Sequence, residues 1–128
     1  MPTTNSFDYA VVRVVPYVER EEFINVGVIL FCRTQRFLAA KIELDEQRLA
    51  AMAPQLDPEK VRHHLELIPR ICGGDASHPI GQLAPAERFH WLVTPRSTSI
   101  QVSGVHTGLC TDPAEALEHL MQAMVRLC

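Results

Sequence analysis

A chain of 128 residues, 47% hydrophobic and 21% charged, fits a single globular domain and gives no support for a disordered or fibrous class. The formal net charge of −3 provides no overall field that would attract nucleic acid. We find neither a signal peptide nor an apolar run of about 20 residues, so the sequence predicts a cytoplasmic protein that binds neither nucleic acid nor membranes.

Residues 7–18 are rich in β-branched and aromatic side chains on both alternating sets, which predicts a strand covered on each face. Arg13 is the single charge inside this strand, and a charge in such a place needs a partner. Pro16 cannot donate a ladder hydrogen bond, so the strand should end, bend or lie on an edge there.

The most apolar run of the sequence follows a charged turn at 19–22 and predicts a second strand at about 25–33. Gly27 lies inside it, and glycine in a strand indicates a bulge or the close approach of another group. A third strand at 36–43 completes a predicted antiparallel meander.

The middle of the chain predicts two helices. Asp45 is a candidate N-cap for a short helix that stops near Pro54, and Asp57 begins the next. We expect Pro69 to kink or end that second helix near residue 68. Residues 73–87, rich in glycine, proline and small polar residues, are a candidate mobile lid or binding loop, with an ordinary surface loop as the alternative.

The last third is harder to interpret. Residues 89–94 and 99–103 favour a second hairpin, and a short helix at 85–92 is the rival interpretation. Asp112 as N-cap, Pro113 at the first helical position and Glu115 three residues after the cap predict a helix to the C-terminus. We therefore predict one α+β domain over 1–128, with an ordered core at about 7–127. It is an antiparallel sheet of about four or five strands with two to three helices packed on it.

Neither cysteine nor histidine spacing supports a metal site. The four cysteines are far apart in sequence, so we predict free thiols. Adjacent His63 and His64 point to different sides of a helix, and the other four histidines are isolated. We predict no metal and no cofactor. No nucleophile elbow and no phosphate-binding glycine loop occurs either, so no complete catalytic motif is present.

Polar residues at the entrance of the second strand form the main candidate site: Arg20, Glu22 and Asn25, with Arg13 from the neighbouring strand. An arginine could hold a phosphate or carboxylate, Glu22 could act as a base and Asn25 could orient a ligand. The alternative is a hairpin end, where arginine and glutamate pair with each other and Asn25 caps loop backbone.

A second group of polar residues lies in the segments 95–98 and 105–110, where Arg96, Ser97, His106 and Thr107 could line a cleft. Ordinary turn chemistry explains these residues about as well.

Several segments resemble a known family: Tyr-Ala-Val-Val-Arg-Val-Val-Pro from Tyr9, Glu-Phe-Ile-Asn-Val-Gly from Glu22, Pro-Arg-Ser-Thr from Pro95 and Val-His-Thr-Gly-Leu-Cys from Val105. Together they are similar to the bacterial family called domain of unknown function 3037, from about Asp8 to Val125. The family has no settled activity, and its members are often encoded beside a HipA-like serine/threonine kinase homologue. The resemblance adds weight to one set of binding residues: Arg13, Arg20, Glu22, Asn25, Gly27, Arg96 and His106.

We therefore expect a non-catalytic module that binds a protein partner through the sheet edge or the loops near 20–25, with a HipA-like kinase as the partner that the resemblance implies. The alternative is an enzyme or regulator that holds a phosphorylated small molecule or nucleotide by Arg13, Arg20 and Arg96, with Glu22 or His106 as general base. Self-association into a homo-oligomer is left open.

Overall fold

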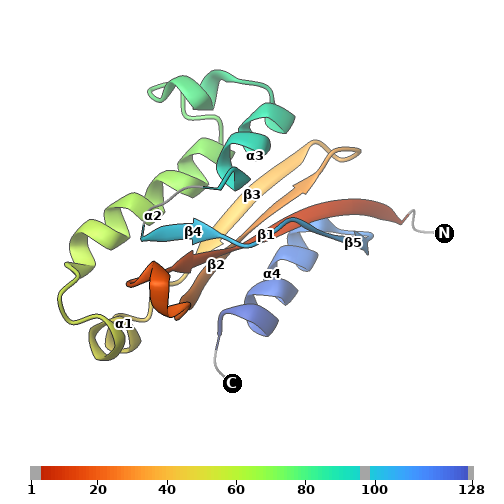
Figure 1. Cartoon of the computed structure of the whole chain (residues 1–128). Helices are drawn as coiled ribbons and strands as arrows, with labels where there is room; N and C mark the ends of the chain where they lie inside the picture. The colour runs from red at the N-terminus through yellow and green to blue at the C-terminus, as the bar shows by residue number, and fades with distance from the viewer. Residues whose placement is uncertain (1–3, 96–98, 127–128) are drawn as a thin grey trace.

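The computed structural model describes residues 4–95 and 99–126, and within those ranges it confirms the predicted α+β fold. These ranges contain five strands and four α-helices, arranged as in Figure 1, with 3₁₀ turns at Val18–Arg20 and Pro79–Gln82. The strands are β1 (Asn5–Val14), β2 (Ile24–Cys32), β3 (Phe37–Ile42), β4 (Ile100–Val102) and β5 (His106–Cys110). The helices are α1 (Glu46–Met52), α2 (Pro58–Cys72), α3 (Pro85–Val93) and α4 (Pro113–Met124). No helix within the described ranges is both long and apolar enough to cross a membrane.

The sheet is built around β1 and is antiparallel throughout. Its order is β3-β2-β1-β4, and β5 pairs with the N-terminal half of β1 on the same side as β4. The predicted meander of β1, β2 and β3 is confirmed. Strands β4 and β5 therefore form one edge of the sheet and β3 forms the other.

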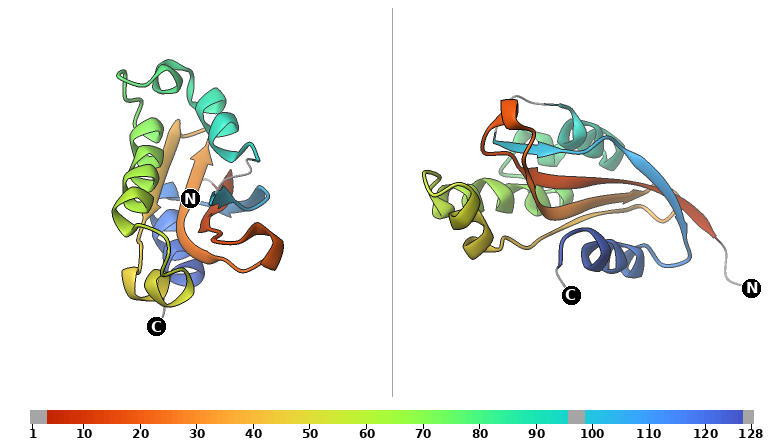
Figure 2. Two further views of the ribbon diagram at one scale, coloured as in Figure 1. Left: turned by 60° about the vertical axis from the view of Figure 1, so that its left-hand side comes forward. Right: turned by 60° about the horizontal axis from the view of Figure 1, so that its bottom comes forward.

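Helices cover both faces of the sheet, as Figures 1 and 2 show. One core lies between the sheet and α1, α2 and α3, and a second core lies under α4. Strand β2 contributes to both, since Ile29 and Phe31 face the first core while Val28, Leu30 and Cys32 face the second. Burial of both faces explains why this strand reads as a continuous apolar run.

A bulge near the start of β2 sets the positions of the polar residues there. Val12 pairs with Gly27 and Arg13 pairs with Asn25, so Val26 has no partner on β1. A Cβ atom on Gly27 would lie 2.5 Å from both Ile42 Cδ1 and the carbonyl oxygen of Lys41. Both predictions for this glycine, a bulge and a close approach, agree with the structure.

Helix α2 does not end at Pro69, as one of the two expectations for this residue had it, because the helix continues to Cys72. Proline at this position removes only the N–H that would reach the carbonyl oxygen of Leu65, whereas the last carbonyl groups of α2 lack intrahelical donors because the helix ends there. The guanidinium of Arg88, from α3, donates to the carbonyl oxygens of Ile71 (2.9 Å) and Cys72 (2.6 Å). A side chain from the next helix thus caps the end of α2.

The predicted second hairpin is wrong. Residues 85–93 form helix α3, the rival interpretation, with Pro85 at its first turn and Phe89 and Leu92 buried one turn apart. Residues 100–102 do form a strand, but it pairs with β1. Part of the candidate loop 73–87 is also helical, and Asp75 orders its start by accepting hydrogen bonds from Arg70 Nε (2.8 Å) and Ser77 N (2.9 Å).

Candidate functional site

Arg20 and Glu22 form an ion pair with each other, at 2.9 Å between Nη2 and Oε1. Their side chains are 59% and 44% exposed, so solvent screens the attraction and the pair adds little stability. This is the arrangement that the hairpin-end interpretation predicts. Glu22 already neutralises the guanidinium of Arg20. This ion pair therefore gives no support to the alternative in which Arg13 and Arg20 together hold a phosphate.

Arg13 is in a different situation. Its side chain is half-buried on the α4 side of β1, and the guanidinium carbon lies 4.1 Å from the centroid of the Phe23 ring. Nε of Arg13 is buried and has no hydrogen-bond partner, and no carboxylate among the described residues forms an ion pair with this arginine. The partner that we expected for this buried charge is therefore the face of the Phe23 ring. The ring cannot accept a hydrogen bond from Nε in the guanidinium plane, so Nε stays without a partner.

Asn25 lies beside Arg13 as its cross-strand partner. Its amide nitrogen donates to the carbonyl oxygen of Met124 (3.0 Å), so it caps the last turn of α4, whereas the hairpin-end alternative expected it to cap loop backbone. The other end of the amide, Oδ1, is buried without a partner. Two adjacent strands thus bring together two buried polar atoms, a donor on Arg13 and an acceptor on Asn25, that the described residues do not satisfy.

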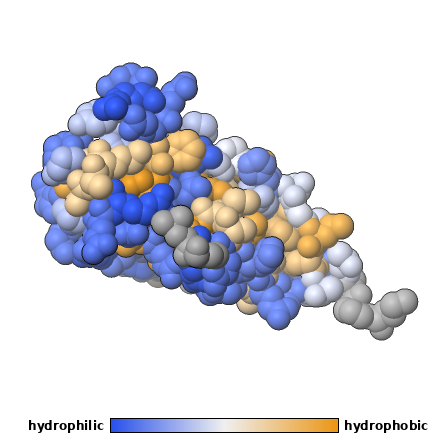
Figure 3. Space-filling view, turned by 90° about the horizontal axis from the view of Figure 1, so that it is seen from below, coloured by the Kyte–Doolittle hydropathy of each residue, from blue (hydrophilic) through white to orange (hydrophobic). Residues whose placement is uncertain are grey.

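The surface around Arg13 is partly apolar. Phe23 is 43% exposed and Met124 is 38% exposed, although both are large hydrophobic residues. Figure 3 shows that the α4 side of the molecule is mostly hydrophilic and is interrupted by separate hydrophobic areas. We call the set Arg13, Phe23, Asn25 and Met124 the entrance patch. Sequence reasoning found Arg13 and Asn25 but missed the other two, because stacking on Arg13 and proximity to Asn25 are tertiary contacts.

The remaining predicted site residues do not join the entrance patch. His106 is exposed on β5, where its ring lies 5.4 Å from that of Tyr9. Tyr9 precedes Arg13 by four residues in β1, a separation of about 13 Å along a strand. Gly27 has a structural role, because its lack of a side chain lets β3 lie close to β2. Arg96 lies outside the described residues.

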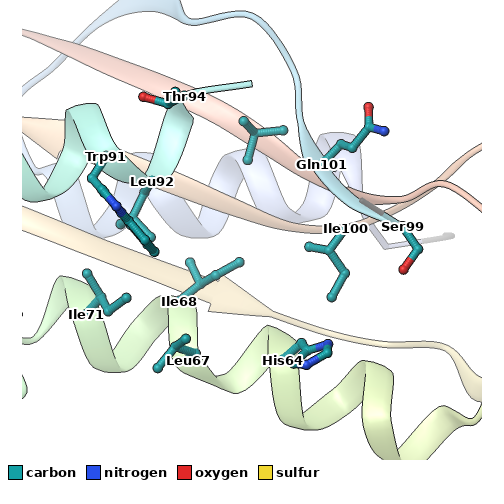
Figure 4. Close-up of a pocket in the computed structure, with 11 residues that line it drawn as sticks. His64, Leu67, Ile68, Ile71, Trp91, Leu92, Thr94, Ser99, Ile100 and Gln101 are labelled. Carbon is teal, nitrogen blue, oxygen red and sulfur yellow. The ribbon is translucent and has the colours of Figure 1, made fainter. Parts of the chain in front are cut away.

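A pocket of about 330 Å³ lies on the opposite side of the sheet, between α2, α3 and the edge strand β4. We call it the edge pocket. Figure 4 shows Ile71, Trp91 and Leu92 at one end and His64, Ser99 and Gln101 at the other. Only one feature of the sequence could have indicated this pocket, namely the alternative interpretation of 85–92 as a helix. A helix there places Trp91 beside α2.

Two of the described thiols, those of Cys72 and Cys110, are poor nucleophiles. Burial raises the pKa of Cys72 to about 12, and burial followed by the neighbouring Cys32 thiol raises that of Cys110. Both therefore stay protonated near neutral pH. Cys32, Cys72 and Cys110 are free, and the described residues contain no group of three or more cysteine, histidine or carboxylate side chains that could hold a metal ion.

Comparison with curated proteins and with solved structures finds no match. A family profile does match: it is described as Protein of unknown function (DUF3037) and covers residues 9–125. The matched range contains all four helices, four of the five strands in full, the entrance patch and the edge pocket. This confirms the resemblance seen in the sequence, and the chain belongs to the DUF3037 family.

Proposed function

We propose that this protein is a non-catalytic binding module, and that the entrance patch docks a protein segment presenting a carboxylate beside an apolar side chain. The observation that carries the proposal is Arg13, a half-buried cation stacked on exposed Phe23 with a buried Nε that has no partner. Charge and shape at this point favour a planar anion.

Three of the other half-buried arginines contrast with Arg13, because each has a protein partner. Arg62 pairs with Glu46 and Glu59, Arg126 pairs with Glu43 and Glu118, and Arg88 donates to backbone carbonyl groups. Withdrawing a charged donor from water without a partner is costly. A carboxylate beside the guanidinium of Arg13 would supply a charge partner that the described residues do not supply, and the stacked ring would already hold the guanidinium plane in place.

The apolar members of the patch support a protein as the ligand. Arginine, aromatic residues and methionine are enriched in protein interfaces, and the residues that contribute most to affinity are often arginine or aromatic. Exposed Phe23 stacks on Arg13, and exposed Met124 is held next to Asn25 by its carbonyl oxygen, so both add apolar area to the patch. The family resemblance suggests a cytoplasmic HipA-like kinase homologue as the first partner to test.

The test is co-purification of a HipA-like kinase homologue with the tagged full chain, for wild type and two double variants. Arg13→Gln with Phe23→Ala removes the guanidinium and the ring of the patch. Arg33→Gln with Leu109→Ala is the control, because it removes one arginine and one exposed hydrophobic side chain away from the patch. Circular dichroism and thermal unfolding verify that both variants fold.

We expect stoichiometric capture by wild type and the control, and loss of capture in the patch variant. Equal capture by a folded patch variant would exclude this surface. Capture of no kinase homologue by any form, together with calorimetric binding of a nucleotide or sugar phosphate that Arg13→Ala abolishes, would replace this proposal with the small-molecule alternative.

A further inference from the structure

We propose that the edge pocket is a binding site for a small amphipathic carboxylic acid, with the apolar body against α2 and α3 and the carboxylate beside His64 and Ser99. This goes beyond the partner-binding function, because the pocket lies on the α2 and α3 side of the sheet while the entrance patch lies on the α4 side. The argument rests on the pocket's size, its polarity and the rigidity of its wall.

The volume of about 330 Å³ lies within the range of about 300–1,000 Å³ that is usual for small-molecule sites. Most of the lining is apolar, and several of these side chains are only partly buried by the protein itself. A ligand body in contact with Leu67, Ile68 and Ile100 would remove that apolar surface from water. Size and lining together fit a ligand with a short aliphatic or aromatic body.

The pocket has one end with polar side chains, while Thr94 lies nearer the Trp91 end. In Figure 4, His64 and Ser99 lie at the end away from Trp91 and Ile71. No carboxylate of the described residues lines the pocket, and the charges around the outer side of His64 are mixed, with Lys60 beside Glu59 and Glu66. This end therefore offers hydrogen-bond donors from His64 and Ser99. A carboxylate head group accepts such bonds.

The apolar wall is held in place before any ligand arrives. The Trp91 ring makes an edge contact with His78, at 5.8 Å between ring centroids. His78 is itself fixed, because its Nδ1 accepts a hydrogen bond from the backbone N–H of Ile80 (3.1 Å). Trp91 also lies next to buried Leu92 in α3. A wall with such supports loses little conformational entropy on binding.

Trp91 is the only tryptophan of the chain, so the intrinsic tryptophan fluorescence reports on this pocket alone. The experiment titrates the full chain with sodium octanoate, with 1-octanol, which has the same tail and no charge, and with acetate, which has the head group and almost no tail. We expect a saturable change with octanoate, weaker binding of octanol, and no change with acetate.

Two kinds of variant locate the two ends of the ligand. Ile68→Phe fills the pocket and should abolish the response, and Leu67→Phe serves the same purpose if Ile68→Phe does not fold. His64→Gln should weaken octanoate binding roughly tenfold and leave octanol binding unchanged, as expected for the loss of one charge-assisted hydrogen bond. His63→Gln is the matched control, since His63 is the neighbouring residue and does not line the pocket.

A result with no saturable fluorescence change for octanoate would overturn the proposal. So would a response that survives in a folded pocket-filled variant. Equal affinities for octanoate and octanol, unaffected by His64→Gln, would overturn the assignment of an acidic ligand.

Discussion

Two half-buried arginines near the end of α4 have opposite surroundings. Arg126 lies between Glu43 on the β3 side and Glu118 of α4, and Lys41 of β3 also pairs with Glu118 (2.5 Å). We call these four residues the Arg126 network. Arg13, in the entrance patch, faces an aromatic ring and has no carboxylate partner among the described residues. The network fastens α4 to β3, whereas the patch leaves a charge available for a ligand.

The comparison separates stability from binding. Paired charges of the Arg126 network should raise the free energy of unfolding, and their loss should not affect a partner. Residues of the entrance patch should do the reverse, because a desolvated and unmatched group lowers stability while it favours a ligand. The predictions below test this division, from the largest expected effect to the smallest.

Gly27→Val should have the largest effect, because Gly27 holds β3, and with it the Arg126 network, close to β2. The new side chain would overlap Ile42 and the Lys41 carbonyl group. We expect the free energy of unfolding in urea to fall by about 3 kcal/mol. Gly104→Val is the control, since a Cβ atom at Gly104 meets nothing within 4 Å and should change stability by less than about 0.5 kcal/mol. Equal effects at the two glycines would contradict the close approach of β3.

Glu118→Gln should remove part of the acid sensitivity of the protein. Hydrogen bonds from Arg126 and then from Lys41 lower the pKa of Glu118 from 4.5 to about 2. The stabilising contribution of Glu118 is therefore complete above pH 4.5 and is lost as the pH falls toward 2. Wild type should lose more stability than the variant between pH 6 and pH 3 in urea unfolding. Glu115→Gln, on the same helix and without an ion pair in the described part of the chain, should leave the wild-type slope intact.

Asn25→Ala tests the contact between the patch and α4. The variant loses the hydrogen bond to the carbonyl oxygen of Met124, and it also removes the unpaired Oδ1 atom. We expect a net loss of about 1 kcal/mol and faster amide exchange confined to the last turn of α4. Gln35→Ala removes an exposed bond of the same type, to the carbonyl oxygen of Thr111, and should cost less. Unchanged exchange in α4 would show that Asn25 does not hold this helix.

Local patterns predicted most of the fold and little of the candidate site. The meander and the C-terminal helix follow from period-2 and period-3.6 patterns and from the Asp112 cap, which accepts a hydrogen bond from the N–H of Ala114. Residues 85–94 are apolar enough for either a strand or a helix, so the pattern alone could not decide between them. Strand β5 carries few apolar residues and depends on pairing with β1, far away in sequence.

The site is non-local for the same reason. Arg13 and Asn25 were identified by residue type and by the family resemblance, but no local pattern shows that Phe23 covers the guanidinium or that Met124 accepts from Asn25. The edge pocket depends on α2, α3 and β4 together, and it appears only when 85–93 is a helix. A surface that several helices and strands form together can be predicted only when their tertiary arrangement is known, and sequence periodicity does not contain that information.

The sharpest prediction compares Arg13→Met with Arg126→Met. In the free protein, Arg13→Met should change the free energy of unfolding by less than about 1 kcal/mol, because the lost cation–π contact is offset by removal of an unmatched buried donor. Arg126→Met leaves Glu43 and Glu118 without their guanidinium, so it should destabilise the protein more, and the difference should shrink as the pH falls from 4.5 toward 2, where the stabilising contribution of ionised Glu118 is lost. In partner capture the order should reverse, with Arg13→Met the damaging change. A strongly destabilised Arg13→Met with intact capture would place Arg13 in the structural scaffold, and the binding surface would then have to lie elsewhere.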